Sequence, residues 1–307
     1  MSDTKEVMKL VSPGSVLAQI AAAIPADCRR NLTIIGSLAV GYHFFGADNT
    51  VMVRTKDVDC LLSPRVEAVL SGVAIAERLL QDHWQFRHDA RWSKPGDANT
   101  EDKNLPAVRL HPPGIQDWFI ELLTVPESPI DQRKRWLRLK TSAGHFGLCS
   151  FGFLSLANYQ PILTPLEIHI AKPQMMALAN LLEHPMIRPE TMSGLIDGRA
   201  IKRSNKDLGR VLAIAHLSIA REDDTLLGWP VQWLPALQVC FPHDWHALAR
   251  RSGDGIRKLL DSPNDLDEAR HTCEFGLLTS QPPNTEQLRI VGRRLLQDAI
   301  EPLEKMA

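Results

Sequence analysis

A single carboxylate, Glu121, interrupts the otherwise apolar segment Trp118–Leu123. A short apolar run of this kind is typical of a buried β-strand, and a buried carboxylate without a partner is costly. We therefore expect a second strand beside this one to supply a partner for Glu121. This requirement limits the folds open to the chain, because it decides which polar strand lies next to the apolar one.

The segment Val51–Leu62 contains the candidate partners. Its sequence, VMVRTKDVDCLL, predicts a strand whose side chains alternate between two faces. Asp57 and Asp59 then share one face, and Val58 points to the other, into the core. Two carboxylates at this spacing can bind a divalent ion such as Mg²⁺, and an ion shared with Glu121 would supply its partner. Three carboxylates on neighbouring strands are typical of a two-metal site.

A Gly-Ser pair precedes this strand. Asn31–Ile35 predicts a short strand that ends at Gly36, and Ser37–Phe45 predicts a helix. Glycine lets backbone approach a ligand closely, and the start of a helix attracts anions. A triphosphate tail could lie on Gly36 and Ser37, with the α-phosphate at the aspartates. The competing interpretations are a plain helix cap for Ser37 and a solvated strand end for the aspartates.

The rest of the first half alternates between helix and strand patterns. Arg65–Gln81 predicts an amphipathic helix, and the polar stretch Arg91–Asn104 predicts a surface loop. Pro112–Gly114 predicts a turn that joins the extended runs Val108–His111 and Trp118–Val125. Together these elements predict a mixed sheet.

The second half is mainly helical in pattern. After two extended runs, Phe151–Leu156 and Leu166–Ile170, the expected helices are Pro173–Leu182, Asn205–Arg221, Trp245–Leu260, Asp265–Cys273 and Thr285–Lys305. We therefore expect an α+β protein, with a mixed-sheet domain over residues 1–165 and a mainly helical C-terminal domain over residues 166–307.

Charge and cysteine content exclude several classes of protein. Lys and Arg total 35 against 36 Asp and Glu, so bulk charge does not suit a protein that coats nucleic acid. No apolar run reaches the length of a membrane span, and Val16–Ala26 reads as a helix rather than a signal peptide. The five cysteines form no Cys-x-x-Cys pair, which argues against a zinc site or a disulfide framework. These features predict a cytoplasmic protein with buried thiols and no membrane contact.

The order of the elements resembles the nucleotidyltransferase superfamily of the DNA polymerase β type. A strand runs into Gly36-Ser37 and a helix, a strand carries Asp57 and Asp59, and a later strand carries Glu121. Within that superfamily, IIGSLAVGYHFFG and RTKDVDCLL resemble the AbiEii-like abortive-infection nucleotidyltransferases, a toxin group. The resemblance covers residues 31–62 and implies the nucleotidyltransferase fold. It also implies an enzyme that binds ATP or another NTP and transfers its NMP with two Mg²⁺ ions.

The resemblance also implies a role for each site residue. Gly36 and Ser37 would hold the triphosphate, Asp57 and Asp59 would bind metal, and Glu121 would be the third metal-binding carboxylate and the base. Family members often have Asp at this last position, and the gap between Ser37 and Asp57 exceeds that of compact members. Because of these two differences from the family, a catalytic site with weakened or no activity is an alternative interpretation.

Three residues of the second half complete the implied nucleotide site. Arg203–Leu208 resembles the Lys-Asp element that opens a late helix in the toxin-like group, which implies that Lys206 and Asp207 help to hold the nucleotide. The helix Pro173–Leu182 lacks the lysine common in the family, and Lys172 at its start is the substitute. The competing interpretation of the Lys-Asp pair is an ordinary helix start.

A basic run follows the strand of Glu121. Its cations are Arg133, Lys134, Arg135, Arg138 and Lys140, and Trp136 lies among them. Such a run can bind an RNA backbone while the indole stacks on a base. The competing interpretation is a solvated face of a helix or hairpin.

Two hypotheses from different classes follow. The first is a nucleotidyltransferase that modifies a hydroxyl of RNA or protein, as a toxin-like or phage-defence enzyme with an antitoxin partner, or else a small molecule such as an antibiotic. The second is a nucleotidyltransferase-fold protein that has lost turnover and acts by binding or regulation. If the match were accidental, Asp57, Asp59 and Glu121 would lie far apart.

Overall fold

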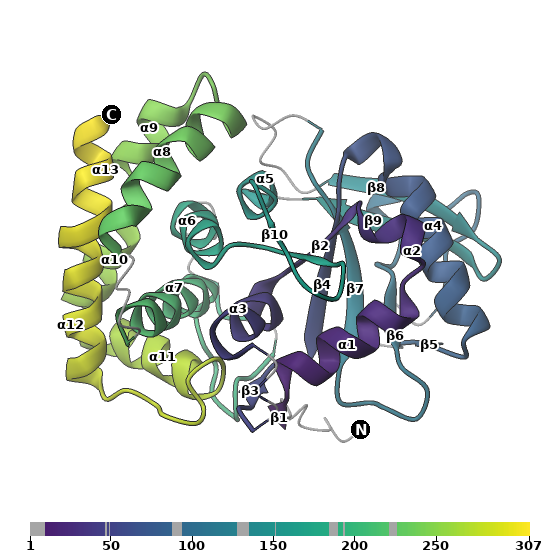
Figure 1. The fold of residues 1–307 in the computed structure, drawn as a ribbon, viewed down its shortest axis with the longest axis horizontal. Coiled ribbons are helices and arrows are strands. Elements are labelled where there is room, and N and C mark those ends of the chain that lie inside the picture. Colours follow the sequence, from purple (N-terminus) through teal and green to yellow (C-terminus); the bar gives the residue numbers. More distant parts are fainter. Residues whose placement is uncertain are drawn as a thin grey trace. The chain divides into compact units, whose positions relative to one another are not determined.

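The computed structural model describes residues 10–46, 48, 50–87, 94–127, 135–150, 152–183, 190–192, 194–220 and 226–307. The chain divides into two compact units, drawn in Figure 1 and described separately below. The sheet unit comprises Val11–Asn49 and Thr55–Lys172, and the helical unit is built mainly from Pro173–Ala307, with Thr50–Arg54 added. In the part of the chain that is described, no helix is long and apolar enough to cross a lipid bilayer.

The sheet unit contains one mixed sheet, as predicted. Its strands are β2 (Leu32–Ile35), β4 (Asp57–Leu62), β5 (Gln85–Phe86), β6 (Arg109–His111), β7 (Phe119–Thr124), β8 (Arg135–Thr141), β9 (Gly144–Ser150), β10 (Ile162–Leu163) and β11 (His169–Ile170). Neighbouring strands follow the order β10, β11, β2, β4, β7, β6, β5, while β9 pairs with both β7 and β8. β4 runs antiparallel to β2 and parallel to β7, so β4 lies between the Gly-Ser strand and the strand of Glu121.

The sheet unit also contains several helices, and a separate small sheet lies outside the main one. The helices are α1 (Pro13–Ala23), α2 (Ala26–Arg29), α3 (Gly36–Phe45), α4 (Arg65–Gln81) and α5 (Leu154–Ala157), with a 3₁₀ turn at Asp102–Asn104. β1 (Leu10–Val11) and β3 (Val53–Arg54) form a separate two-stranded sheet. α4 spans the residues predicted for it.

The two faces of β4 differ as the alternation predicts. Val58 is fully buried, whereas Asp57 and Asp59 are partly exposed. α4 covers the face to which Val58 points, and it approaches closely at Gly72, where an added Cβ would lie 3.3 Å from both Leu62 and Leu139. The carboxylates therefore lie on the face opposite α4.

The structure corrects the predicted strand boundaries at two places. The expected strand Val51–Leu62 is interrupted at Thr55 and Lys56, and its first part belongs to the helical unit. The expected extended run Phe151–Leu156 is also wrong over its described residues, because β9 ends at Ser150 and α5 begins at Leu154. For the basic run, the sequence left both a helix and a hairpin open. Its described part lies on β8, which forms a hairpin with β9.

The helical unit is arranged around α7. Its helices are α6 (Pro173–Glu183), α7 (Arg203–Ala220), α8 (Trp229–Cys240), α9 (Trp245–Arg250), α10 (Asp254–Asp261), α11 (Pro263–Glu274), α12 (Thr285–Leu295) and α13 (Glu301–Met306). A 3₁₀ turn, Leu226–Gly228, precedes α8, and a π-helical segment, Leu296–Ile300, joins α12 to α13. α7 packs against α6, α10, α11 and α12, which makes it the centre of this unit.

Two expectations for this half need correction. The helix expected over Trp245–Leu260 is broken after Arg250, so α9 and α10 are separate. α8 was not predicted at all, although Trp229 and Trp233 on it are almost completely buried.

The cysteines agree with the expectation of buried thiols. All five are free and buried. Burial raises the pKa of the Cys240 thiol to about 11 and that of Cys273 to about 12, so both are protonated at neutral pH.

Close packing of α7 against α11 depends on Gly209. A Cβ there would lie 2.8 Å from the carbonyl oxygen of Ala269 and 3.0 Å from Cβ of Thr272. We expect Gly209→Ala to lower the free energy of unfolding by about 1–2 kcal/mol, because overpacking exceeds the gain in helix propensity. Urea denaturation measures this, with Gly194→Ala as the control, since that Cβ would meet no atom within 4 Å. Equal stability of the two variants would contradict the packing argument.

Candidate functional site

The structure places two of the three predicted carboxylates side by side. Asp59 on β4 is the register partner of Glu121 on β7, and register partners point to the same face of a sheet. Asp57 shares that face, two residues earlier on β4. An accidental match would leave these carboxylates far apart, and the structure instead places them close together.

Glu121 has a protein partner in this structure. Arg109 on β6 is its register partner on the other side, and the Nε of Arg109 donates to Oε2 of Glu121 at 2.8 Å. The Glu121 side chain is 15% exposed and that of Arg109 is 32% exposed, so the carboxylate is the better covered of the two groups. The partner of the carboxylate in this structure is thus an arginine, where the sequence had led us to expect a metal ion.

The carboxylates do not form a ready three-ligand metal set. Among the described residues, no group of three or more His, Cys, Asp or Glu side chains is arranged to hold a metal ion. Asp57 and Asp59 remain a pair of partly exposed carboxylates on one strand. This pair suits an Mg²⁺ ion that takes its other ligands from water and substrate phosphates.

Thr55, which was not among the predicted site residues, orients Asp57. Its hydroxyl donates to the backbone carbonyl of Asp57 at 3.0 Å and lies 3.4 Å from Oδ1 of the same residue. The Thr55 side chain is buried, and it lies at the interruption between β3 and β4. The break in the expected strand therefore brings a hydroxyl to the first aspartate.

Gly36 brings the start of α3 against Asp59. Gly36 has φ of +75°, and an added Cβ would lie 2.8 Å from Oδ2 of Asp59. Glycine is required here for both the conformation and the space. The carboxylate therefore lies at the positive end of the α3 dipole, where negative charge is stabilised.

Ser37 is not the cap of α3. It is the second residue of the helix, behind Gly36, and Ile35 at the N-cap position provides no side-chain hydrogen bond. Ser37 is partly exposed. The plain-cap interpretation of Ser37 is therefore wrong, and its hydroxyl lies in the first turn of the helix.

The approach of Gly36 to Asp59 can be tested with a matched pair of variants. Gly36→Ala and Gly114→Ala both place alanine at positive φ, +75° and +71°, but an added Cβ at Gly114 would meet no atom within 4 Å. Positive φ costs alanine about 1–2 kcal/mol at either position. We expect Gly36→Ala to lose clearly more stability, because it also displaces the Asp59 carboxylate. Thermal unfolding measures both, and an equal loss would contradict the close contact.

Lys172 lies near the same end of β2. β11 runs parallel to β2, and the backbone N–H of Ala171 donates to the carbonyl of Ile34 at 2.9 Å. Lys172 follows directly, beside the strand end that leads into Gly36. Its ammonium lies 3.4 Å from Oε1 of Gln160.

The basic run is only partly described. Arg133, Lys134 and the side chain of Arg135 lie outside the described residues. Arg138 holds a neighbouring loop: its Nε donates to Asp102 Oδ1 at 2.8 Å, and its Nη groups contact the carbonyls of Asp97 and Thr100. Lys140 is exposed. Arg138 therefore has a structural role in this loop.

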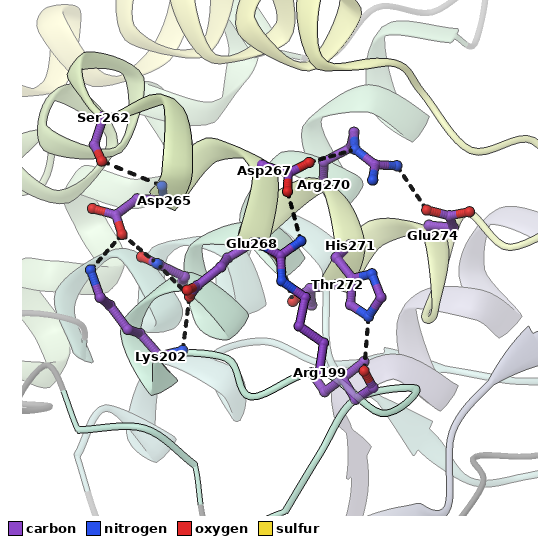
Figure 2. A network of polar contacts seen from close by, with 12 residues as sticks. Arg199, Lys202, Ser262, Asp265, Asp267, Glu268, Arg270, His271, Thr272 and Glu274 are labelled. Carbon is purple, nitrogen blue, oxygen red and sulfur yellow. Dashed lines mark hydrogen bonds and ion pairs between the residues drawn. The ribbon is translucent and has the colours of Figure 1, made fainter.

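Lys206 and Asp207 belong to the helical unit, at the start of α7. Figure 2 shows how carboxylates of α11 hold this start. Asp265 Oδ1 accepts from Lys202 Nζ at 2.6 Å and from Asn205 Nδ2 at 2.9 Å. Glu268 Oε2 accepts from the backbone N–H of Lys202 and from Asn205 Nδ2, both at 2.9 Å. The first turn of α7 is thus anchored to α11.

A second part of the network fixes the segment before α7. Arg199 donates to Asp267 at 2.6 Å, and Arg270 bridges Asp267 and Glu274 (Figure 2). Hydrogen bonds from Arg199 and Arg270 lower the pKa of Asp267, although burial opposes this shift.

Asp207 is a buried carboxylate with a perturbed pKa. The residue is 8% exposed. Burial raises its pKa above the ordinary value, and the charges of Arg210, Lys206 and Arg203 oppose the shift without cancelling it. A buried carboxylate that costs stability is typical of functional positions, although ion-pair networks also perturb pKa values.

Replacing Asp207 tests whether its buried carboxylate lowers stability. Its raised pKa means that folding favours the protonated form, so the ionised form lowers stability at neutral pH. We expect Asp207→Asn to raise the Tm at pH 7, and the gain to vanish below the ordinary pKa of about 3.9. Calorimetry over pH measures this. A lower Tm at pH 7 would contradict the assigned pKa shift.

Comparison of the chain with protein-family models, with curated proteins and with solved structures finds no match.

Proposed function

We propose that this chain is an Mg²⁺-dependent nucleotidyltransferase of the nucleotidyltransferase fold, which moves an NMP from an NTP to a hydroxyl of RNA or protein. The observation that carries the proposal is the position of Asp59. It touches the start of α3 through Gly36 and pairs in register with Glu121. The Gly-Ser turn, the Asp-x-Asp strand and the third carboxylate therefore meet at one end of one sheet.

Each group of site residues would have its own role in the reaction. The start of α3, with its first-turn N–H groups and the Ser37 hydroxyl, would hold the triphosphate. The acceptor oxygen bonds to the α-phosphorus, the bond from that phosphorus to the bridging oxygen breaks, and pyrophosphate leaves with that oxygen. The hydroxyl proton passes to a carboxylate, for which Glu121 is the candidate. Positioning and charge stabilisation supply most of the rate enhancement.

Asp57 and Asp59 are the residues that would hold Mg²⁺. The ion neutralises charge on the phosphates when bound, and one or two carboxylates with substrate phosphates make its usual ligand set. A second ion would also need Glu121, whose carboxylate is bound by Arg109 here. Nucleotide-binding roles for Lys172, Lys206 and Asp207 stay predictions from the resemblance, as do the toxin-like role and an antitoxin partner.

One observation favours the second candidate function, a binding or regulatory protein without turnover. The Arg109–Glu121 pair occupies the carboxylate that catalysis would use as ligand or base. An NTP that binds with Mg²⁺ and is never transferred to any acceptor would support this candidate.

Label transfer from each α-³²P NTP with Mg²⁺ to cellular RNA or lysate protein tests the proposed function. We expect Asp57→Asn and Asp59→Asn to reduce transfer about 10²–10³-fold, because charge stabilisation at the phosphates is lost. The matched control is Asp27→Asn, which removes an exposed carboxylate from α2. Transfer by Asp59→Asn at the wild-type rate would refute the assignment, as would absence of transfer from every NTP.

A further inference from the structure

A row of charged residues crosses the sheet at the level of Asp59. Ile35 pairs with Asp59, Asp59 with Glu121, and Glu121 with Arg109. The row continues to Arg87, whose backbone N–H donates to the carbonyl of Arg109 at 2.9 Å. Two carboxylates are therefore followed, in order, by two arginines.

The side chain of Phe119 holds both arginines. The guanidinium carbon of Arg87 lies 4.3 Å from the centroid of this ring, and that of Arg109 lies 5.9 Å from it. Phe119 shares the sheet face with Glu121 and is itself buried. Two guanidinium groups are thus gathered on one aromatic ring beside the carboxylates.

We propose that Arg87 and Arg109 form a phosphate-binding pair beside the carboxylates. Guanidinium groups match phosphate oxygens in geometry, and stacking on a ring restrains them in advance. A guanidinium has five N–H donors, so Arg109 can bind Glu121 and a phosphate together.

The position of the pair indicates which phosphate it meets. Arg109 lies one strand beyond Glu121, and Arg87 lies two strands beyond it. Neighbouring strands in a sheet are about 4.8 Å apart. Gly36 and Ser37 lie on the opposite side of Asp59. If the triphosphate occupies that side, as the proposed function has it, the arginines face the acceptor. This orientation rests on the proposed function, whereas the phosphate site itself does not.

Binding measurements test the pair without requiring turnover. The probes are a fluorescent single-stranded RNA of about 12 nucleotides, ATP with Mg²⁺, and adenosine as the ligand without phosphate. We expect Arg87→Ala and Arg109→Ala each to weaken RNA binding about tenfold. Each should also reduce the slope of log affinity against log salt by about 0.7. Anisotropy over a salt series measures both effects, and the affinity for ATP should stay unchanged.

Three further variants separate binding from folding. Arg30→Ala removes an exposed arginine of the same unit and should leave binding unchanged. Arg87→Lys keeps the charge and should retain most of the salt slope while it loses affinity. Glu121→Gln should strengthen RNA binding severalfold, because it removes a competing anion, and a misfolded protein would not show such a gain.

The outcomes are distinct. If the alanine variants weaken ATP binding instead, the pair is a phosphate site for the nucleotide. If they weaken neither ligand, or if Arg30→Ala weakens RNA binding equally, the proposal is overturned. RNA binding that needs the pair in a protein without transfer refutes the proposed function and keeps the phosphate site. If the alanine variants of Arg87 and Arg109 transfer label as fast as the wild type and bind RNA as tightly, the phosphate site is refuted and the proposed nucleotidyl transfer still stands.

Discussion

The need of the largely covered Glu121 carboxylate for a cationic partner determines how the centre of this sheet is built. Arg109, in register on β6, donates to this carboxylate and meets the need, whereas Asp59, in register on β4, places a second negative charge beside it. Register sets which side chains share a face, and the pairing of Asp59 with Ile35 on β2 carries Asp59 to Gly36 at the start of α3. A shift of one residue in β7 would turn Glu121 toward α4, away from both Asp59 and Arg109.

Much of the site could be predicted from local sequence because its signals are local. Alternation along β4 placed Asp57 and Asp59 opposite Val58, and the Gly-Ser pair marked the start of α3. The partner of Glu121 could not be predicted, because the pairing of β6 with β7 joins residues 12 positions apart through a turn whose register the sequence does not reveal. The prediction that Glu121 needs a partner is confirmed. The partner in this structure is Arg109, whereas the predicted partner was a metal ion.

Two of the remaining errors have identifiable physical causes. α8, which was not predicted, contains two prolines, but Pro230 lies in the first turn, where its missing N–H costs nothing, and burial of Trp229 and Trp233 outweighs Pro235. Val51–Leu62 has a continuous strand pattern, yet Arg54 bonds to the Gly276 carbonyl and Thr279 in the helical unit. Tertiary contacts override local pattern at both places.

Anomalous diffraction from crystals grown with Mn²⁺ and a non-hydrolysable NTP would show whether Asp57 and Asp59 bind metal beside a nucleotide. We expect an anomalous peak at the carboxylates of Asp57 and Asp59, with the triphosphate extending to the first turn of α3 at Gly36 and Ser37. A nucleotide bound elsewhere, or no manganese at these aspartates, would refute the proposed nucleotidyl-transfer site.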